Sequence, residues 1–411
     1  MSPAAPRARG GGRVSSRGAA AAREMSAHNR RGDWAAALQI FATATAALGN
    51  RTHNAAVYVE AIRAHGALGR PARALDTFQT LQASSLPPSL IGYTAAIRAC
   101  ATATHWPVAL SLLQDARDEG IEPDTVALNA ALAACERGGQ SDEALLLLSE
   151  MEASPSAPPD RISYNTAIAA CSRCGEWRTA LRLLGEMAER DARDEGLSPN
   201  TVSTNCALAA CEAGGAWRDA LALLDEAAAP DAISFHTAIA ACRRAGGRPA
   251  ARAALRLLRR MRAAHVRPSL IGYTTVMNAL SAAGYVRPAL LVFRALCADH
   301  DPDERAVHTA LRACDGAGRR ADGLALLAEL AESGAAGEKL ARRFRPLWDA
   351  KAAAAHKAPA AAAAVAGGSG RGRGRTRGGS GRGSAAPPQW RRRSRRSRKG
   401  PPPEHEAARG E

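Results

Sequence analysis

Polar side chains recur at a regular spacing inside stretches that are otherwise rich in Ala and Leu. They share one register and are Thr94, Asn129, Asn165, Asn205, His236, Thr274 and His308. Asn and Thr are poor helix formers, so local helix propensity does not explain a choice of these residues over Ala. Amides, hydroxyls and imidazoles donate and accept hydrogen bonds. The register therefore predicts a surface that hydrogen-bonds a ligand.

A second set of polar residues recurs at the same spacing, each directly after a proline. The set comprises Ser89, Asp124, Asp160, Asn200, Asp231, Ser269 and Asp303. Asp, Asn and Ser are preferred at the N-cap of a helix, where the side chain accepts from a backbone N–H. Capping alone accounts for these identities, so a ligand-binding role at these positions stays open beside it.

The two sets belong to repeats. Starting each unit after the proline pair gives units that begin at residues 55, 90, 125, 161, 201, 232, 270 and 304, with spacings of 31 to 40 residues. In the unit from Thr125, an apolar stripe at helical spacing precedes Gly138-Gly139 and a second stripe follows it. A hairpin this short cannot bury its own apolar face. The sequence therefore predicts an all-α fold, an α-solenoid of stacked two-helix repeats of about 35 residues.

Composition divides the rest of the chain. Residues 1–23 carry five Arg and no acid, which indicates a transit peptide or a disordered basic arm. Residues 24–54 read as a degenerate N-terminal repeat or cap, 55–337 as the array, and 338–350 as a C-terminal capping helix. Residues 351–411 are Ala-rich and then Arg- and Gly-rich, and are expected to be disordered. Because the net charge of +16 lies in the tails, residues 24–350 are close to neutral.

Several kinds of site are not expected. Six of the nine cysteines share one register, which favours small buried hydrophobes over disulfides. Cys171-x-x-Cys174 is a single pair, so neither a zinc site nor another cofactor is predicted. No apolar run is long enough to span a membrane. Trp34, Trp106, Trp177 and Trp217 begin second helices and should pack between the helices of their repeats, with RNA stacking as the alternative.

The repeat resembles the pentatricopeptide repeat. The resemblance rests on residues 125–132 and 161–168 in the first helix, on 144–151 and 180–187 in the second, and on the terminal Pro-Asp pair. It covers about residues 55–337, resembles the P-type array, and comes without a recognisable catalytic domain. It implies a right-handed solenoid in which each repeat reads one base of single-stranded RNA with two or three side chains.

By this resemblance, the fifth and last residues of a unit contact the base edge. The pairs are Thr94 with Asp124, Asn129 with Asp160, Asn165 with Asn200, Asn205 with Asp231, His236 with Ser269, and Thr274 with Asp303. The second residues would sandwich the bases: Ile91, Val126, Ile162, Val202, Ile233 and Ile271. In the family's code Thr with Asp favours G, Asn with Asp favours U, and Asn with Asn favours C. The implied site is 5′-GUCUxG-3′, where x faces His236.

The basic tail suits contact with RNA phosphates, without sequence preference. Its candidate residues are Arg371, Arg373, Arg375, Arg377, Arg391, Arg392, Arg393, Arg395 and Arg396. Arg-rich blocks also serve as nuclear localisation signals, so a nuclear location is an alternative.

Together these features predict a sequence-specific RNA-binding protein that acts without catalysis on organellar transcripts, in RNA processing, stability or translation. A chloroplast is favoured over a mitochondrion. Other RNA-processing proteins would be further partners, whereas a membrane or a small-molecule substrate is not expected. The alternative is an α-solenoid scaffold for protein–protein interaction. A ribonuclease or cytidine deaminase would need clustered acids or a His-x-Glu and Cys-x-x-Cys set, and the carboxy-terminal region has neither.

Overall fold

A computed structural model describes residues 11–48, 54–84, 86, 89–102, 104–193, 196–332 and 337–349 of the chain. Within these ranges every regular element is a helix, so the predicted all-α solenoid is confirmed. The first helices of the repeats are α3 Ala55–Ala67, α5 Leu90–Ala101, α7 Thr125–Gly138, α9 Arg161–Cys174, α11 Thr201–Gly214, α13 Ala232–Ala245, α15 Leu270–Ala282 and α17 Glu304–Gly316. Each begins at the residue where the sequence starts a unit.

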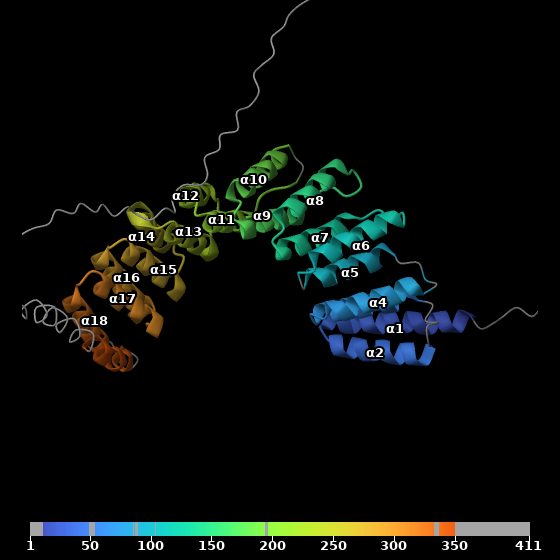
Figure 1. Cartoon of the computed structure of the whole chain (residues 1–411), viewed down its shortest axis with the longest axis horizontal. Coiled ribbons are helices and arrows are strands. Elements are labelled where there is room, and N and C mark those ends of the chain that lie inside the picture. The colour runs from blue at the N-terminus through green and yellow to red at the C-terminus, as the bar shows by residue number, and fades with distance from the viewer. Residues whose placement is uncertain are drawn as a thin grey trace, which may run out of the picture. The chain divides into compact units, whose positions relative to one another are not determined.

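The second helices alternate with the first. They are α4 Pro71–Ala83, α6 Trp106–Asp118, α8 Ser141–Ala153, α10 Trp177–Asp191, α12 Trp217–Glu226, α14 Gly247–Ala263, α16 Val286–Asp299 and α18 Arg320–Glu332. Each first helix from α3 to α15 packs against the first helix of the next repeat, and these helices form one continuous layer (Figure 1). The second helices pack on this layer, and each of them from α4 to α16 contacts the first helices on either side of it.

Small residues allow this close layering. Ala and Cys line the buried face of the first helices, and a Cβ added to Gly66 in α3 would lie 3.1 Å from the Cβ of Ala99 in α5. Larger side chains fill the space beneath the layer, among them the fully buried Tyr58, Tyr93, Tyr164 and Tyr273. Because each repeat buries its apolar face against its neighbours, the position of one first helix sets that of the next.

Local signals at the helix ends explain why the repeats start where they do. Asp124, Asp160, Asn200, Asp231, Ser269 and Asp303 each cap a first helix by accepting from a backbone N–H, whereas Ser89 makes no side-chain capping bond. At the other end, Gly139, Gly175 and Gly215 take left-handed backbone conformations, which glycine adopts without strain. Six of the seven post-proline residues therefore cap the helix that follows them.

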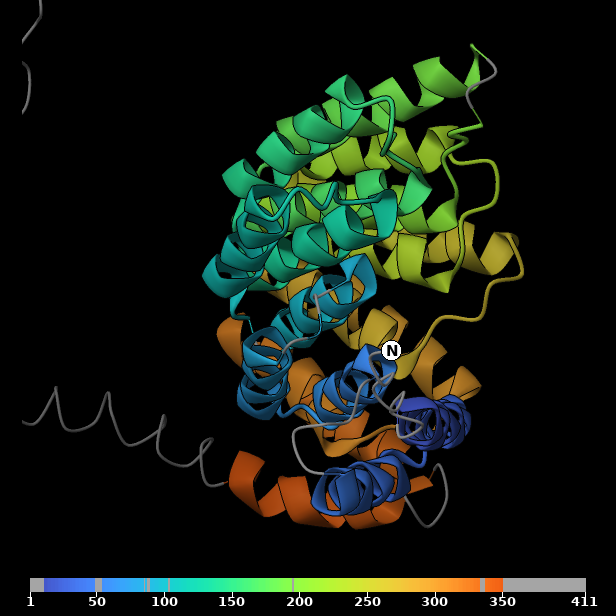
Figure 2. The same cartoon turned by 90° about the vertical axis from the view of Figure 1, so that its right-hand side faces the viewer.

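The N-terminal end differs from the expectation. A helix α1 runs from Gly11 to Arg31 and α2 from Trp34 to Leu48, and the two lie side by side in both views (Figures 1 and 2). The boundary drawn at residue 23 therefore falls inside a helix, and residues 11–23 are not a disordered arm. Met25 is fully buried, and Asn29 Nδ2 donates to the backbone oxygen and to the carboxylate of Glu60, at 3.0 and 2.8 Å. Met25 and Asn29 thus pack against α3, a contact that the basic composition of this segment does not indicate.

At the C-terminal end, residues 337–349 are helical where a capping helix over 338–350 is expected. Trp348 from this segment is buried, and its indole ring lies against Gly323 of α18. Residues 1–10, where the predicted transit peptide begins, and residues 351–411, the predicted disordered tail, lie outside the described residues.

Two of the tryptophans that begin second helices contact the following repeat. A Cβ on Gly138 would lie 2.4 Å from Trp106 Cδ1, and one on Gly214 would lie 2.3 Å from Trp177 Cδ1. Both glycines belong to the first helix of the following repeat. These two indoles therefore contact the next repeat, which the expectation of packing between the helices of one repeat did not include.

The cysteine register is buried as predicted. Cys100, Cys135, Cys171, Cys211, Cys242 and Cys314 are fully buried and free. Burial raises the thiol pKa of Cys211 to about 12 and that of the other five to about 11.

Alkylation of the native protein at neutral pH should therefore spare these six cysteines. The exposed Cys174 should react roughly 100-fold faster or more, because a thiol must be both accessible and ionised to attack the reagent. Peptide mass spectrometry after a timed iodoacetamide pulse measures this difference. All nine cysteines should react in denaturant, and labelling of Cys135 at the rate of Cys174 in native protein would contradict the burial.

Candidate nucleic-acid interface

The second residues of the units form an exposed apolar row. Six positions on consecutive first helices are 54 to 73% exposed: Ile91, Val126, Ile162, Val202, Ile233 and Ile271. They account for half of the twelve large apolar side chains that are exposed in the described part of the chain. A helix normally turns such residues inward, so their regular exposure marks one face of the first-helix layer as a contact surface.

Beside this row, the fifth and last residues of a unit contact each other. In the unit from Thr125, Asn129 Nδ2 donates to Asp160 Oδ1 at 3.1 Å. The hydroxyl of Ser163, the third residue of the next unit, lies 2.6 Å from Asn129 Oδ1 and 2.9 Å from Asp160 Oδ1. The resemblance pairs Asn129 with Asp160, and the structure places them in contact.

The unit from Thr201 repeats this arrangement. Asn205 Nδ2 lies 3.3 Å from Asp231 Oδ1, and the Ser234 hydroxyl donates to Asn205 Oδ1 at 2.7 Å. Burial alone would raise the pKa of each Asp carboxyl. The hydrogen bonds from the serine backbone N–H and from the Asn amide outweigh burial, so the pKa values of Asp160 and Asp231 lie below their usual range. Both carboxylates are therefore ionised at neutral pH.

The unit from Arg161 carries an amide in place of the carboxylate. Asn200 Oδ1 accepts from the backbone N–H and from the hydroxyl of Ser203, both at 3.0 Å. The Oδ1 atom of Asn165 is buried and has no hydrogen-bond partner. An unpaired buried acceptor carries a desolvation penalty of about 1–3 kcal/mol.

The remaining pairs present other groups. The hydroxyl of Thr94 donates to Leu90 O at 2.8 Å and that of Thr274 to Ile271 O at 3.0 Å, so neither donates to the Asp that ends its unit. Each Thr oxygen keeps acceptor capacity. His236 Nε2 lies 3.3 Å from Ser269 Oγ, and burial lowers the pKa of the imidazole.

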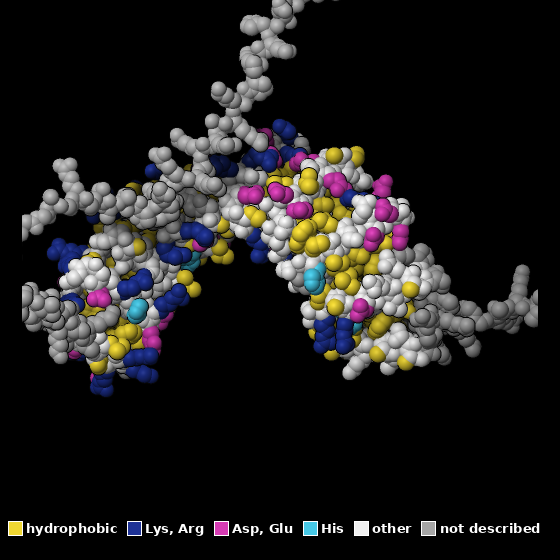
Figure 3. All heavy atoms as spheres, viewed as in Figure 1, with side chains coloured by type: hydrophobic (Ala, Val, Ile, Leu, Met, Phe, Trp, Pro, Cys, Tyr) yellow, Lys and Arg dark blue, Asp and Glu magenta, His cyan; other side chains and the backbone are white. Residues whose placement is uncertain are grey.

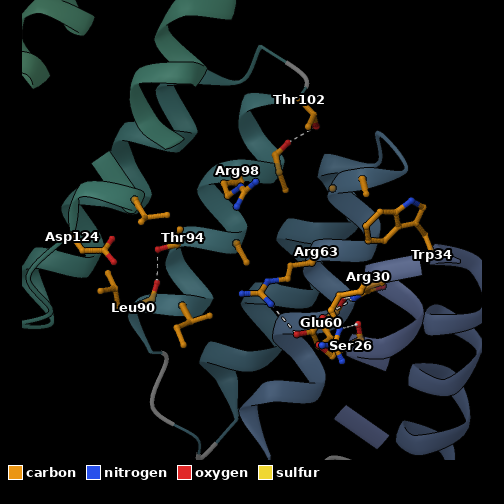
Figure 4. Close-up of a pocket in the computed structure, with 17 residues that line it drawn as sticks. Ser26, Arg30, Trp34, Glu60, Arg63, Leu90, Thr94, Arg98, Thr102 and Asp124 are labelled. Carbon is orange, nitrogen blue, oxygen red and sulfur yellow. Dashed lines mark hydrogen bonds and ion pairs between the residues drawn. The ribbon is translucent and has the colours of Figure 1, made fainter. Parts of the chain in front are cut away.

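A pocket of about 550 Å³ lies where this face meets the N-terminal hairpin. In Figure 4, Arg63 and Arg98 lie between Thr94 and Asp124 on one side and Arg30 on the other. Arg63 also pairs with Glu60 at 2.9 Å. The lining thus carries three guanidinium groups against the carboxylates of Glu60 and Asp124, an excess of one positive charge, and guanidinium groups suit phosphate.

Sequence reasoning missed these arginines because the net charge of residues 24–350 is close to zero. The charge is unevenly spread over the surface: on the face in Figure 3, acidic side chains gather over α6, α8 and α10, and basic ones are more frequent over α14–α18. One signal was present in the sequence, since Arg63 and Arg98 are each the ninth residue of a unit. The tail arginines proposed for phosphate contact lie outside the described residues.

The described residues contain neither a membrane-spanning helix nor a cluster of metal ligands. None of the helices in the described ranges is long and apolar enough to cross a membrane. In the same part of the chain, no group of three or more His, Cys, Asp or Glu side chains is placed to hold a metal ion.

Comparisons with known proteins agree with the geometry of the repeats. The family model of the PPR repeat matches residues 162–191, and that of the pentatricopeptide repeat domain matches residues 76–137 and 111–172. No curated protein matches the sequence.

Solved structures also match. The crystal structure of the pentatricopeptide repeat protein PPR10 from maize is 26% identical, with a TM-score of 0.57, and the match covers 80% of this chain and 47% of that one. PPR10 in complex with an 18-nt psaJ RNA element is 18% identical with a TM-score of 0.37, over 82% and 64% of the two chains. The chain thus spans about half the length of the first of these structures. The stacked two-helix units, the family models and the maize structure together show that the chain contains pentatricopeptide repeats.

Proposed function

We propose that the chain binds single-stranded RNA sequence-specifically, with one base per repeat. Each base lies between the second residues of successive units, and its edge meets the fifth and last residues of one unit. The observation that carries this proposal is the exposed apolar row beside polar pairs that recur in the same register. An apolar surface contacts the two faces of a base, whereas an amide or carboxylate contacts its edge.

The expected site is 5′-GUCUxG-3′, read from the unit at Leu90 to the unit at Leu270, with the N-terminal repeat at the 5′ end. Arg63 and Arg98 would contact phosphates near that end, and the arginines of the tail would add affinity that depends on salt. We further propose that the chain acts in a chloroplast or mitochondrion, without catalysis of its own. It would protect, expose or remodel a transcript there, with other proteins supplying any chemistry.

Selection of RNA from a random pool tests the base-reading claim. The full chain should enrich a motif containing GUCU when salt is high enough to suppress sequence-independent binding. The variant Asn129→Thr should change the base opposite that unit from U to G. In Thr94 and Thr274 the hydroxyl proton is held by the helix, so threonine presents an acceptor, which suits the N–H donors of guanine.

The neighbouring bases of the motif serve as the internal control, because Asn165 and Asn205 are unchanged in this variant. If the pool yields no motif, or if the motif is the same with Thr at position 129, the base-reading claim fails. The protein-binding scaffold then becomes the better description of the array.

A further inference from the structure

The third residue of each repeat varies together with the fifth residue of the repeat before it. Asn129, Asn165 and Asn205 are followed by Ser163, Ser203 and Ser234 at the third position of the next unit. The fifth residues that are not Asn are followed by Ala or Gly there: Val59 by Gly92, Thr94 by Ala127, His236 by Gly272, and Thr274 by Ala306. The serine thus occurs with asparagine only, and it is fully buried in all three units.

Helix capping does not account for this association. Asp124 and Asp303 cap their helices with Ala at the third position, so a serine hydroxyl is not needed for a capped start. At the histidine unit a side chain is excluded, because a Cβ on Gly272 would lie 2.6 Å from His236 Nε2. The third residue therefore responds to the fifth residue of the preceding unit, across the boundary between repeats.

The hydrogen bonds around Asp160 indicate which acceptor receives the hydroxyl proton of Ser163. Asp160 Oδ1 already accepts from the backbone N–H of Ser163 at 2.8 Å and from Asn129 Nδ2 at 3.1 Å. The backbone N–H of Asp160 donates to Ser163 Oγ at 3.1 Å. A hydroxyl has one proton to give, and Asn129 Oδ1 at 2.6 Å is the nearer acceptor with capacity left.

This arrangement holds the amide of Asn129 in one orientation. If the amide were turned over, its oxygen would face the carboxylate of Asp160, and two acceptors would meet without a proton between them. The serine hydroxyl binds one lone pair of the amide oxygen, and the aspartate accepts one amide proton. The second Nδ2–H of Asn129 is a donor that this fixed orientation leaves for a ligand.

The unit with an amide at its last position lacks this constraint. Ser203 donates to Asn200 instead, and Asn165 Oδ1 keeps no partner. The amide oxygen is thus unpaired in Asn165, whereas in Asn129 it already accepts from Ser163. Uracil carries a carbonyl oxygen at ring position 4, where cytosine carries an amino group. A fixed donor matches uracil there, and a free acceptor matches cytosine.

We infer that Ser163 and Ser234 are specificity-determining positioning residues, which orient the fifth-position asparagine of the preceding repeat so that it accepts uracil and rejects cytosine. The reading unit then has three members drawn from two repeats: asparagine, aspartate and serine. This inference rests on the proposed RNA binding and adds to it the interaction by which the protein distinguishes uracil from cytosine.

The test compares Ser163→Ala with the unchanged full chain on RNA oligonucleotides that carry U or C at the second position of GUCUAG, within a fixed flank. We expect the preference for U over C to fall about tenfold, the factor that one hydrogen bond contributes. A purely structural role of the serine would weaken binding to both oligonucleotides equally and leave their ratio unchanged.

Ser203→Ala is the matched control. Ser203 is equally buried and belongs to the same kind of capping box, but it makes no bond to Asn165. The two variants should lose similar stability on urea unfolding, and Ser203→Ala should keep the preference for C at the third position. Ser234→Ala should relax the preference for U at the fourth position, as Ser163→Ala does at the second.

The outcomes separate the inference from the proposed function. An unchanged ratio of U to C affinities in Ser163→Ala overturns the inference, while the discrimination shown by the unchanged chain still supports sequence-specific binding. Failure of the unchanged chain to bind any of the oligonucleotides overturns the proposed function, and the positioning role falls with it. Binding without any preference between U and C at the second position overturns the inference and the assignment of U to Asn129, while preferences at the other positions would still support sequence-specific binding.

Discussion

Replacing Ile162 and Val202 together with serine is expected to weaken binding of the GUCU-containing RNA about 100-fold and to leave the fold intact. The two side chains are 62% and 56% exposed, so they contribute little to the core. In the proposed complex, they enclose the base read by Asn165 and Asn200 and touch one face of each neighbouring base. Loss of stacking contacts costs about 1–3 kcal/mol per base, and each 1.4 kcal/mol is about a tenfold change in affinity.

Leu146→Ser with Leu291→Ser is the matched control. These leucines are 69% and 60% exposed but lie on the second helices α8 and α16, away from the polar pairs. Fluorescence anisotropy with a labelled oligonucleotide should show unchanged affinity for this control and circular dichroism should show native helix content for both variants. Equal losses of affinity in the two variants would mean that the exposed apolar row is not the RNA-contacting surface.

The second large effect concerns the contact between repeats. Gly214→Ala should destabilise the array by about 1–3 kcal/mol, the usual range for overpacking a buried contact. Its new Cβ would lie 2.3 Å from Trp177 Cδ1 and 2.9 Å from the backbone oxygen of Gly175, so the indole and the turn that ends α9 would both have to move. Urea unfolding followed by circular dichroism measures the loss.

Gly185→Ala is the control for this substitution. Gly185 also lies inside a helix, α10, and a Cβ there meets nothing within 4 Å. Alanine at this position should stabilise the chain by about 0.5–1 kcal/mol, since glycine loses more backbone entropy on folding. Equal midpoints for the two variants would show that the indole of Trp177 does not rest on Gly214.

The sequence alone determined where the repeats begin. The proline, the capping residue and the apolar stripe are local signals, and they place the start of α7 at Thr125 and of α9 at Arg161. The fifth-position register was also visible, because asparagine inside an Ala-rich helix has no local explanation. At the N-terminal end, composition indicated a transit peptide or a disordered basic arm over residues 1–23, whereas the structure places residues 11–23 in α1, whose Met25 and Asn29 contact another repeat.

Only the tertiary structure decided which of these polar atoms meet. Asn129 and Ser163 are 34 residues apart and belong to different repeats, so their contact depends on how α7 and α9 pack. The same holds for Trp177 on Gly214 and for Arg63 beside Arg98, which join residues that no local signal connects. Local hydrogen bonding sets the ends of a helix, whereas the angle and distance between stacked helices set the interface. The shape of the reading surface is therefore a property of the stack rather than of any single repeat.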